Sequence, residues 1–158
     1  TRYESLTSML ESLGFSVATS VLDVREGEST PEESRSLDLQ EGDRVIRLSR
    51  LKYGDGKPLV FSVSAIPRSL LPGPIDHRDW SASLVGALEA HGHRIVSSSA
   101  RISAVELPAE PERTFRLSGL GPWLLVAESC VSQDGARVLY SEDYHRGSEI
   151  AFNVLRRR

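Results

Sequence analysis

Apolar residues near the start of the chain recur at helical spacing. Leucine or methionine stands at positions 6, 9, 10 and 13, and Gly14 follows directly. This spacing predicts an amphipathic helix that ends at the glycine. From Phe15 to Arg25 the residues turn β-branched and aromatic, which predicts a strand, and the polar run 26–31 predicts a loop.

A short helix is predicted after this loop. Thr30 is suited to cap it, Pro31 to occupy its first position, and the two glutamates at 32 and 33 to favour its positive end. We expect this helix to end near Gly42. Farther along, Ser83 opens a second stretch at helical spacing that stops at Gly92, and 94–107 is predicted to be a long strand.

Two hairpins are predicted from Asp-Gly turns. Val45–Tyr53 and Leu59–Ile66 flank Asp55-Gly56, a dipeptide that favours a tight turn between antiparallel strands. Trp123–Ser132 and Val138–His145 flank the second such dipeptide. In the strand 59–66, alternate residues share a face. One face is wholly apolar, whereas the other carries the hydroxyls of Ser62 and Ser64.

The chain contains an internal repeat. Pro31-Glu32 recurs 80 residues later as Pro111-Glu112, and Asp55-Gly56 recurs 79 residues later as Asp134-Gly135. The shorter offset matches Ser62 with Ser141 and Ser64 with Asp143. Two copies are too few for a solenoid, so we expect a pseudo-two-fold pair whose hairpins share one antiparallel sheet. The predicted fold class is α+β, with helices on one face and a pocket against the hydroxyl-bearing face.

Composition narrows the function classes. The chain has 158 residues, enough for one domain with its own core, and a net charge of −3 from 19 basic and 22 acidic residues. Domains that grip nucleic acid are strongly basic, so we expect no direct DNA contact. No apolar run approaches the roughly 20 residues that span a bilayer, and the single cysteine excludes an internal disulfide. We expect a cytoplasmic protein with no membrane contact.

The order of motifs resembles the effector-binding (UTRA) domain of the HutC subfamily of GntR-family bacterial transcription regulators. The matching residues run from Leu37 through Gly42 and Arg50-Leu51 to Asp55-Gly56, and then through Ser64 to Ile66-Pro67. The ending Tyr140-Ser141, Tyr144-His145-Arg146-Gly147 and Phe152 also fits. The resemblance covers nearly the whole chain, and its strength lies in the order of pieces that are individually weak.

The resemblance implies a chorismate lyase-like fold and a single effector-binding and dimerisation domain over residues 1–158. It also implies a homodimer, a small polar effector, and DNA binding only through a winged helix-turn-helix domain that we expect upstream of this chain. An apolar strand over Ile150–Leu155 could contribute to the dimer. We expect no enzyme activity and no cofactor. Two alternatives remain open: an enzyme of the chorismate lyase type, and a dimerisation module without a ligand.

Candidate ligand-binding residues come from the repeat and from the resemblance. Ser64 and Asp143 occupy equivalent places in the two copies, and His145 shares a strand face with Asp143. The resemblance assigns Arg101 to an anionic group of the ligand, which a guanidinium suits. Arg50 could line the pocket or pair with Glu128.

Asp143 departs from the family pattern, because relatives that bind phosphosugars often carry Ser or Thr there. A carboxylate repels a phosphate, so a hydroxylated, amine-bearing or otherwise partly cationic ligand is favoured. His91 and His93 supply only two imidazoles across a glycine and do not predict a metal site. The sequence shows no set of residues arranged for catalysis.

Overall fold

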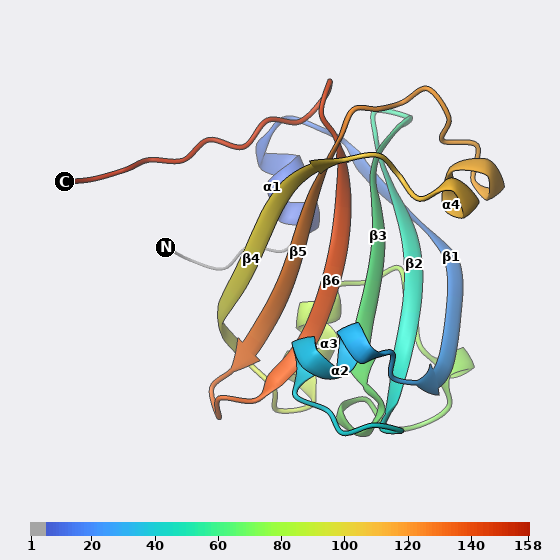
Figure 1. The fold of residues 1–158 in the computed structure, drawn as a ribbon, viewed down its shortest axis with the longest axis vertical. Coiled ribbons are helices and arrows are strands. Elements are labelled where there is room, and N and C mark those ends of the chain that lie inside the picture. The colour runs from blue at the N-terminus through green and yellow to red at the C-terminus, as the bar shows by residue number, and fades with distance from the viewer. Residues whose placement is uncertain (1–5) are drawn as a thin grey trace.

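The computed structural model describes residues 6–158 and contains one six-stranded antiparallel sheet (Figure 1). Its strand order is β1-β2-β3-β6-β5-β4, and every neighbouring pair is antiparallel. The predicted α+β fold class and both hairpins are therefore confirmed. The strands are β1 (Val17–Glu28), β2 (Arg44–Gly54), β3 (Lys57–Pro67), β4 (Ile95–Val105), β5 (Trp123–Ser132) and β6 (Arg137–Arg146).

The sheet has the internal symmetry that the repeat predicts. Strands β1, β2 and β3 occupy one half, and β4, β5 and β6 occupy the other in mirrored order. At the centre, Ser62 of β3 pairs with Asp143 of β6, and Ser64 pairs with Ser141. The 79-residue offset exchanges these two pairs, so the pseudo-two-fold axis passes through the pair between them, Val63 and Glu142.

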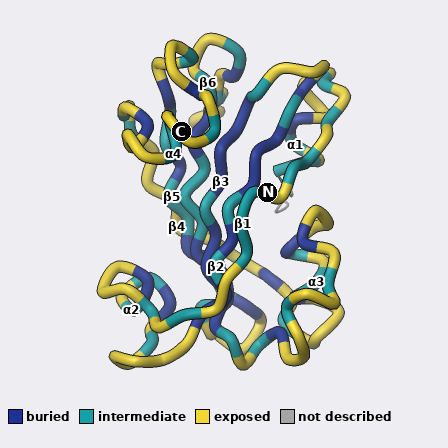
Figure 2. Tube along the Cα trace, turned by 90° about the vertical axis from the view of Figure 1, so that its right-hand side faces the viewer, coloured by how far each residue is buried: buried dark blue, intermediate teal, exposed yellow. Residues whose placement is uncertain are grey.

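The helices are α1 (Leu6–Ser12), α2 (Pro31–Leu37), α3 (Leu84–Ala90) and α4 (Ala109–Thr114), with short 3-10 turns η1 (Arg68–Leu70) and η2 (Ile75–His77). They cover both faces of the sheet, α1 and α3 on one and α2 and α4 on the other, which corrects the predicted single helical face (Figure 2). The physical reason lies in β3. Val60 and Ile66 flank the two serines on the hydroxyl-bearing face, and both are fully buried.

Helix α2 begins as predicted and ends earlier. Thr30 accepts a hydrogen bond from the backbone N–H of Glu33, and the Glu33 carboxylate accepts one from the N–H of Thr30, which forms a capping box. The helix ends at Leu37 because Asp38 adopts a left-handed conformation, with φ 51°. The predicted end near Gly42 is therefore wrong. Arg47 of β2 donates to Glu33 at 2.7 Å and fixes α2 against the sheet.

The C-terminal segment does not form the predicted strand. Ile150 is buried against α1, but residues 150–158 have no regular structure and pair with no strand of the described chain. Val154 and Leu155 are 78% and 79% exposed. The apolar pattern there was too short to decide between a strand and an exposed tail. No helix in residues 6–158 is long and apolar enough to cross a membrane.

Candidate functional site

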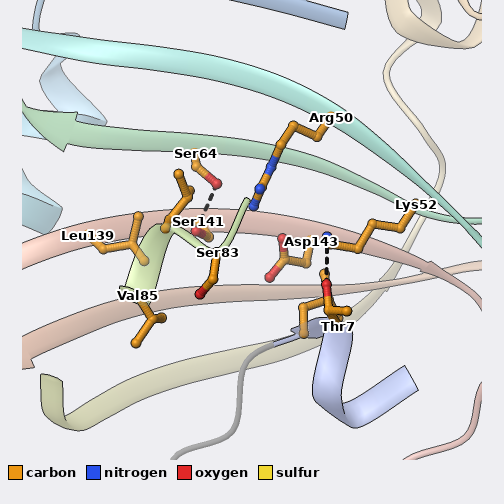
Figure 3. Close-up of a pocket in the computed structure, with 11 residues that line it drawn as sticks. Thr7, Arg50, Lys52, Ser64, Ser83, Val85, Leu139, Ser141 and Asp143 are labelled. Atoms are coloured by element: carbon orange, nitrogen blue, oxygen red, sulfur yellow. Dashed lines mark hydrogen bonds between the residues drawn. The ribbon is translucent and has the colours of Figure 1, made fainter. Parts of the chain in front are cut away.

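A polar cavity of about 70 Å³ lies at the centre of the sheet, on the face covered by α1 and α3 (Figure 3). Three of the predicted site residues line it: Arg50 from β2, Ser64 from β3 and Asp143 from β6. Their strands bring them together because Arg50 pairs with Ser62, and Ser62 pairs with Asp143. Thr7 on α1 and Ser83 at the start of α3 close the sides.

Arg50 points into this cavity from β2 and is 7% exposed. One terminal nitrogen donates to the carbonyls of Ala82 at 3.1 Å and Trp80 at 3.4 Å. Its Nε has no hydrogen-bond partner among the described residues. Burial lowers the pKa of Arg50, and the charge of Asp143 acts in the opposite direction. Arg50 therefore donates to these two carbonyls and not to Glu128, the alternative partner suggested by the sequence.

Lys52 is a site residue that the sequence reasoning missed. It lies two residues after Arg50 on the same face of β2, is 3% exposed and lines the cavity. Its Nζ donates to Thr7 Oγ1 and Thr19 Oγ1, each at 2.9 Å. Burial, reinforced by the charge of Arg50, lowers the pKa of Lys52 from 10.5 to about 8. The two-residue period of β2 was the signal that could have identified it.

Asp143 lies between the two cationic side chains in Figure 3. Asp143 is partly exposed and lines the cavity. Burial of its carboxyl group raises the pKa of that group. None of the ion pairs among the described residues includes Asp143, Arg50 or Lys52. Ser64 and Ser141 share a hydrogen bond of 3.0 Å beside them. The cavity therefore presents opposite charges that face one space without direct pairing.

His145 lies on the same face as Asp143 but outside the cavity lining. It is 2% exposed, and its Nδ1 donates to the carbonyl of Leu124 at 3.2 Å. Its ring packs edge-on against the ring of Phe152, with 4.9 Å between the two ring centroids. Burial lowers the pKa of His145. The ring is thus held by the C-terminal segment and β5 at the margin of the site.

Arg101 is not brought to this cavity. It is exposed on edge strand β4 and pairs with Ala127, which in turn pairs with Glu142. Because Glu142 alternates with Asp143 along β6, Arg101 faces the opposite side of the sheet. That side holds a separate cavity of about 380 Å³ between α4 and the sheet, walled by Phe61, Phe115 and Tyr144 among others.

Metal chemistry has no support in residues 6–158. The structure places no three His, Cys, Asp or Glu side chains there in a group that could hold a metal ion. His91 instead donates from Nδ1 to the carbonyl of Ala87 at 3.0 Å, as part of the α3 C-terminus.

Known proteins provide an independent comparison. The family model described as the UTRA domain matches residues 12–151. The effector domain of PhnF from Mycobacterium smegmatis superposes with a TM-score of 0.88 at 18% identity, covering 98% of this chain and 95% of that one. A GntR-family regulator from Enterococcus faecalis V583 gives 0.74 at 24% identity, with 88% and 100% covered. One from Bacillus cereus gives 0.77 at 16% identity, with 89% and 99% covered. No curated protein matches in sequence.

Proposed function

This chain belongs to the UTRA domain family, and on that premise we propose that it is the effector-binding module of a GntR-type transcription regulator of the HutC branch. One observation carries the proposal. Arg50 and Lys52 from β2 and Asp143 from β6 converge on a single cavity between the two halves of the sheet. Charged side chains are costly to enclose without partners, so they are retained where a ligand completes their interactions.

The geometry also supports a route from the cavity to the N-terminal side of the chain. Lys52 holds Thr7 of α1 through a hydrogen bond of 2.9 Å. A ligand that attracts the Lys52 ammonium would weaken or redirect this bond and so move α1 against the sheet. In a regulator of this type, α1 follows the linker from a winged helix-turn-helix domain. Ligand binding would thereby change the placement of the DNA-binding domains.

Two further features belong to the proposal. We expect the regulator to act in the cytoplasm as a homodimer that contacts DNA only through that other domain, with no enzyme activity. The outer edge of β4, which pairs with no other strand of residues 6–158, and the exposed Val154 and Leu155 are surfaces that a second copy could cover. Sedimentation equilibrium of the isolated domain tests this expectation, and a single 17.4 kDa species at all concentrations would contradict it.

A thermal-shift screen of sugars, amino acids, carboxylates and phosphorylated compounds tests the proposed function. A ligand present at 100 times its dissociation constant stabilises the folded domain by about 2.7 kcal/mol, which raises the melting temperature by several degrees. We expect the affinity of each hit to change in the Asp143→Asn variant, falling for a ligand that carries an amine and rising for a purely anionic one. The Arg101→Ala variant serves as a matched control on the other face of the sheet and should bind as the parent does. A hit that responds to Arg101→Ala but not to Asp143→Asn would place the effector elsewhere.

A further inference from the structure

The two cationic side chains of the cavity have N–H donors that make no hydrogen bond within the described residues. A lysine ammonium has three N–H donors, and Lys52 directs two of them to Thr7 and Thr19. Arg50 directs one terminal nitrogen to backbone carbonyls, and its Nε–H has no partner among the described residues. Lys52 therefore keeps one N–H for a ligand. Arg50 keeps its second terminal nitrogen, which makes no hydrogen bond to the described residues, whereas its Nε is enclosed by protein. Two such donors suit the two oxygens of an acid group.

Asp143 offers hydrogen-bond acceptors and a negative charge in the same cavity. Its carboxylate accepts hydrogen bonds when ionised, and no ion pair of residues 6–158 uses it. Arg50 and Lys52 influence it only through longer-range attraction. A ligand that offered only an acid group would gain from the two cations and be repelled by this carboxylate. A ligand that also carried an ammonium would gain from all three groups.

The size of the cavity limits the ligand. About 70 Å³ is far below the 300–1,000 Å³ typical of pockets that hold drug-sized molecules. The cavity thus fits a compact molecule or the charged end of a longer one. Ser141 of β6 and Ser83 at the start of α3 add hydroxyls to its lining.

We propose, on the basis of the function proposed above, that the effector is a small zwitterion whose ammonium binds Asp143 and whose acid group binds Arg50 and Lys52. The proposal follows from the three charges that face one cavity without pairing with each other. The acid group is a carboxylate or a phosphate ester, and the test below includes both.

Calorimetric titration of the intact domain with matched pairs of compounds tests this inference. Glycine, β-alanine, γ-aminobutyrate and O-phosphoethanolamine each carry both groups. Acetate, propionate, butyrate and ethyl phosphate are their counterparts without the amine. We expect at least one zwitterion to bind about 10- to 100-fold more tightly than its counterpart, as the loss of one charged hydrogen bond implies. Equal or tighter binding of every amine-free counterpart would overturn the proposal.

Two variants assign the charges. Asp143→Asn keeps the shape of the side chain and should abolish the preference for the amine. Glu142→Gln is the matched control, because it neutralises the adjacent carboxylate of the same strand on the opposite face. Lys52→Met should weaken both members of a pair alike, since it removes a partner of the acid group only. A preference for the amine that survives Asp143→Asn in a folded domain would refute the assignment.

Failure of this inference is distinguishable from failure of the proposed function. If uncharged or purely anionic compounds stabilise the domain through Arg50 while no zwitterion of the panel binds, the effector class is wrong and the sensing function stands. If no compound of the wider screen binds the domain, both are contradicted.

Discussion

Replacing Lys52 by methionine should change how the stability of the domain depends on pH. Methionine keeps most of the length of the side chain and removes its charge. In the parent protein the pKa of Lys52 falls from 10.5 to about 8 on folding, mainly through burial. Between these two pH values the unfolded chain binds more protons at this position than the folded chain does. Stability therefore rises with pH across this window.

The magnitude follows from the two pKa values. Each pH unit of difference corresponds to 1.36 kcal/mol, so the parent should gain about 3 kcal/mol between pH 8 and pH 10.5. At pH 7 the ammonium of Lys52 is charged, and replacing it by an apolar group should remove a similar free-energy cost of burying that charge. The loss of the bonds to Thr7 and Thr19 offsets part of this, at about 1 kcal/mol each. Lys52→Met should therefore be more stable than the parent by about 1 kcal/mol at pH 7.

Urea denaturation of both proteins at intervals from pH 7 to pH 10 measures this effect. Burial raises the pKa of Tyr144 to about 12, so ionisation of this group in the unfolded chain lowers stability at the upper end of the range. Both proteins contain Tyr144, and the effect cancels in their difference. We expect the advantage of the variant to disappear and then reverse as the pH rises above 8. A difference that stays constant over the whole range would refute the assignment of a depressed pKa to Lys52.

Two further substitutions test the packing that positions the site. Arg47→Met should destabilise the domain by about 3 kcal/mol in urea titrations, because it strands the Glu33 carboxylate, which is 7% exposed, without its ionic partner. An unchanged midpoint would mean that α2 does not depend on this pair. Gly54→Ala should cost about 1–3 kcal/mol, because an added Cβ would lie 2.2 Å from Leu59 Cδ1. Gly27→Ala is the control in thermal melts, since its nearest neighbour would lie at 3.7 Å. Equal melting temperatures for the two glycine variants would contradict the crowding at Gly54.

Much of the fold was predictable because its determinants are local. The Asp-Gly turns define both hairpins, and the capping residue Thr30 defines the start of α2. The 79-residue offset that matches Ser62 with Ser141 also agrees with the symmetric centre of the sheet. Equivalent residues of a two-fold pair meet at its axis, and Val63 pairs there with Glu142, 79 residues later. The end of α2 at Asp38 was not predictable from the pattern, because several residues before Gly42 could have ended the helix.

The candidate site was predictable only in strands for which the sequence shows which alternate residues share the face of the cavity. The buried hydroxyls of β3 identify that face, and β2 and β6 follow it through pairing, which brings Arg50 and Asp143 together. In strand β4 the sequence does not show which residues face which side, because residues 96–101 are all exposed and mostly small or polar. Its register shift between Ile95 and Ser97 then decides which face Arg101 occupies.

Most helices and strands, both antiparallel hairpins and the duplication could be predicted from the order of the residues, because turn chemistry, capping and two-residue alternation act between neighbours in the chain. Three features became visible only in the folded chain: helices cover both faces, Lys52 joins Arg50 and Asp143 at one cavity, and Arg101 lies across the sheet from them. These outcomes depend on which strands pair, in what register, and on which apolar faces remain to be covered. Contacts between residues far apart in the chain set all three.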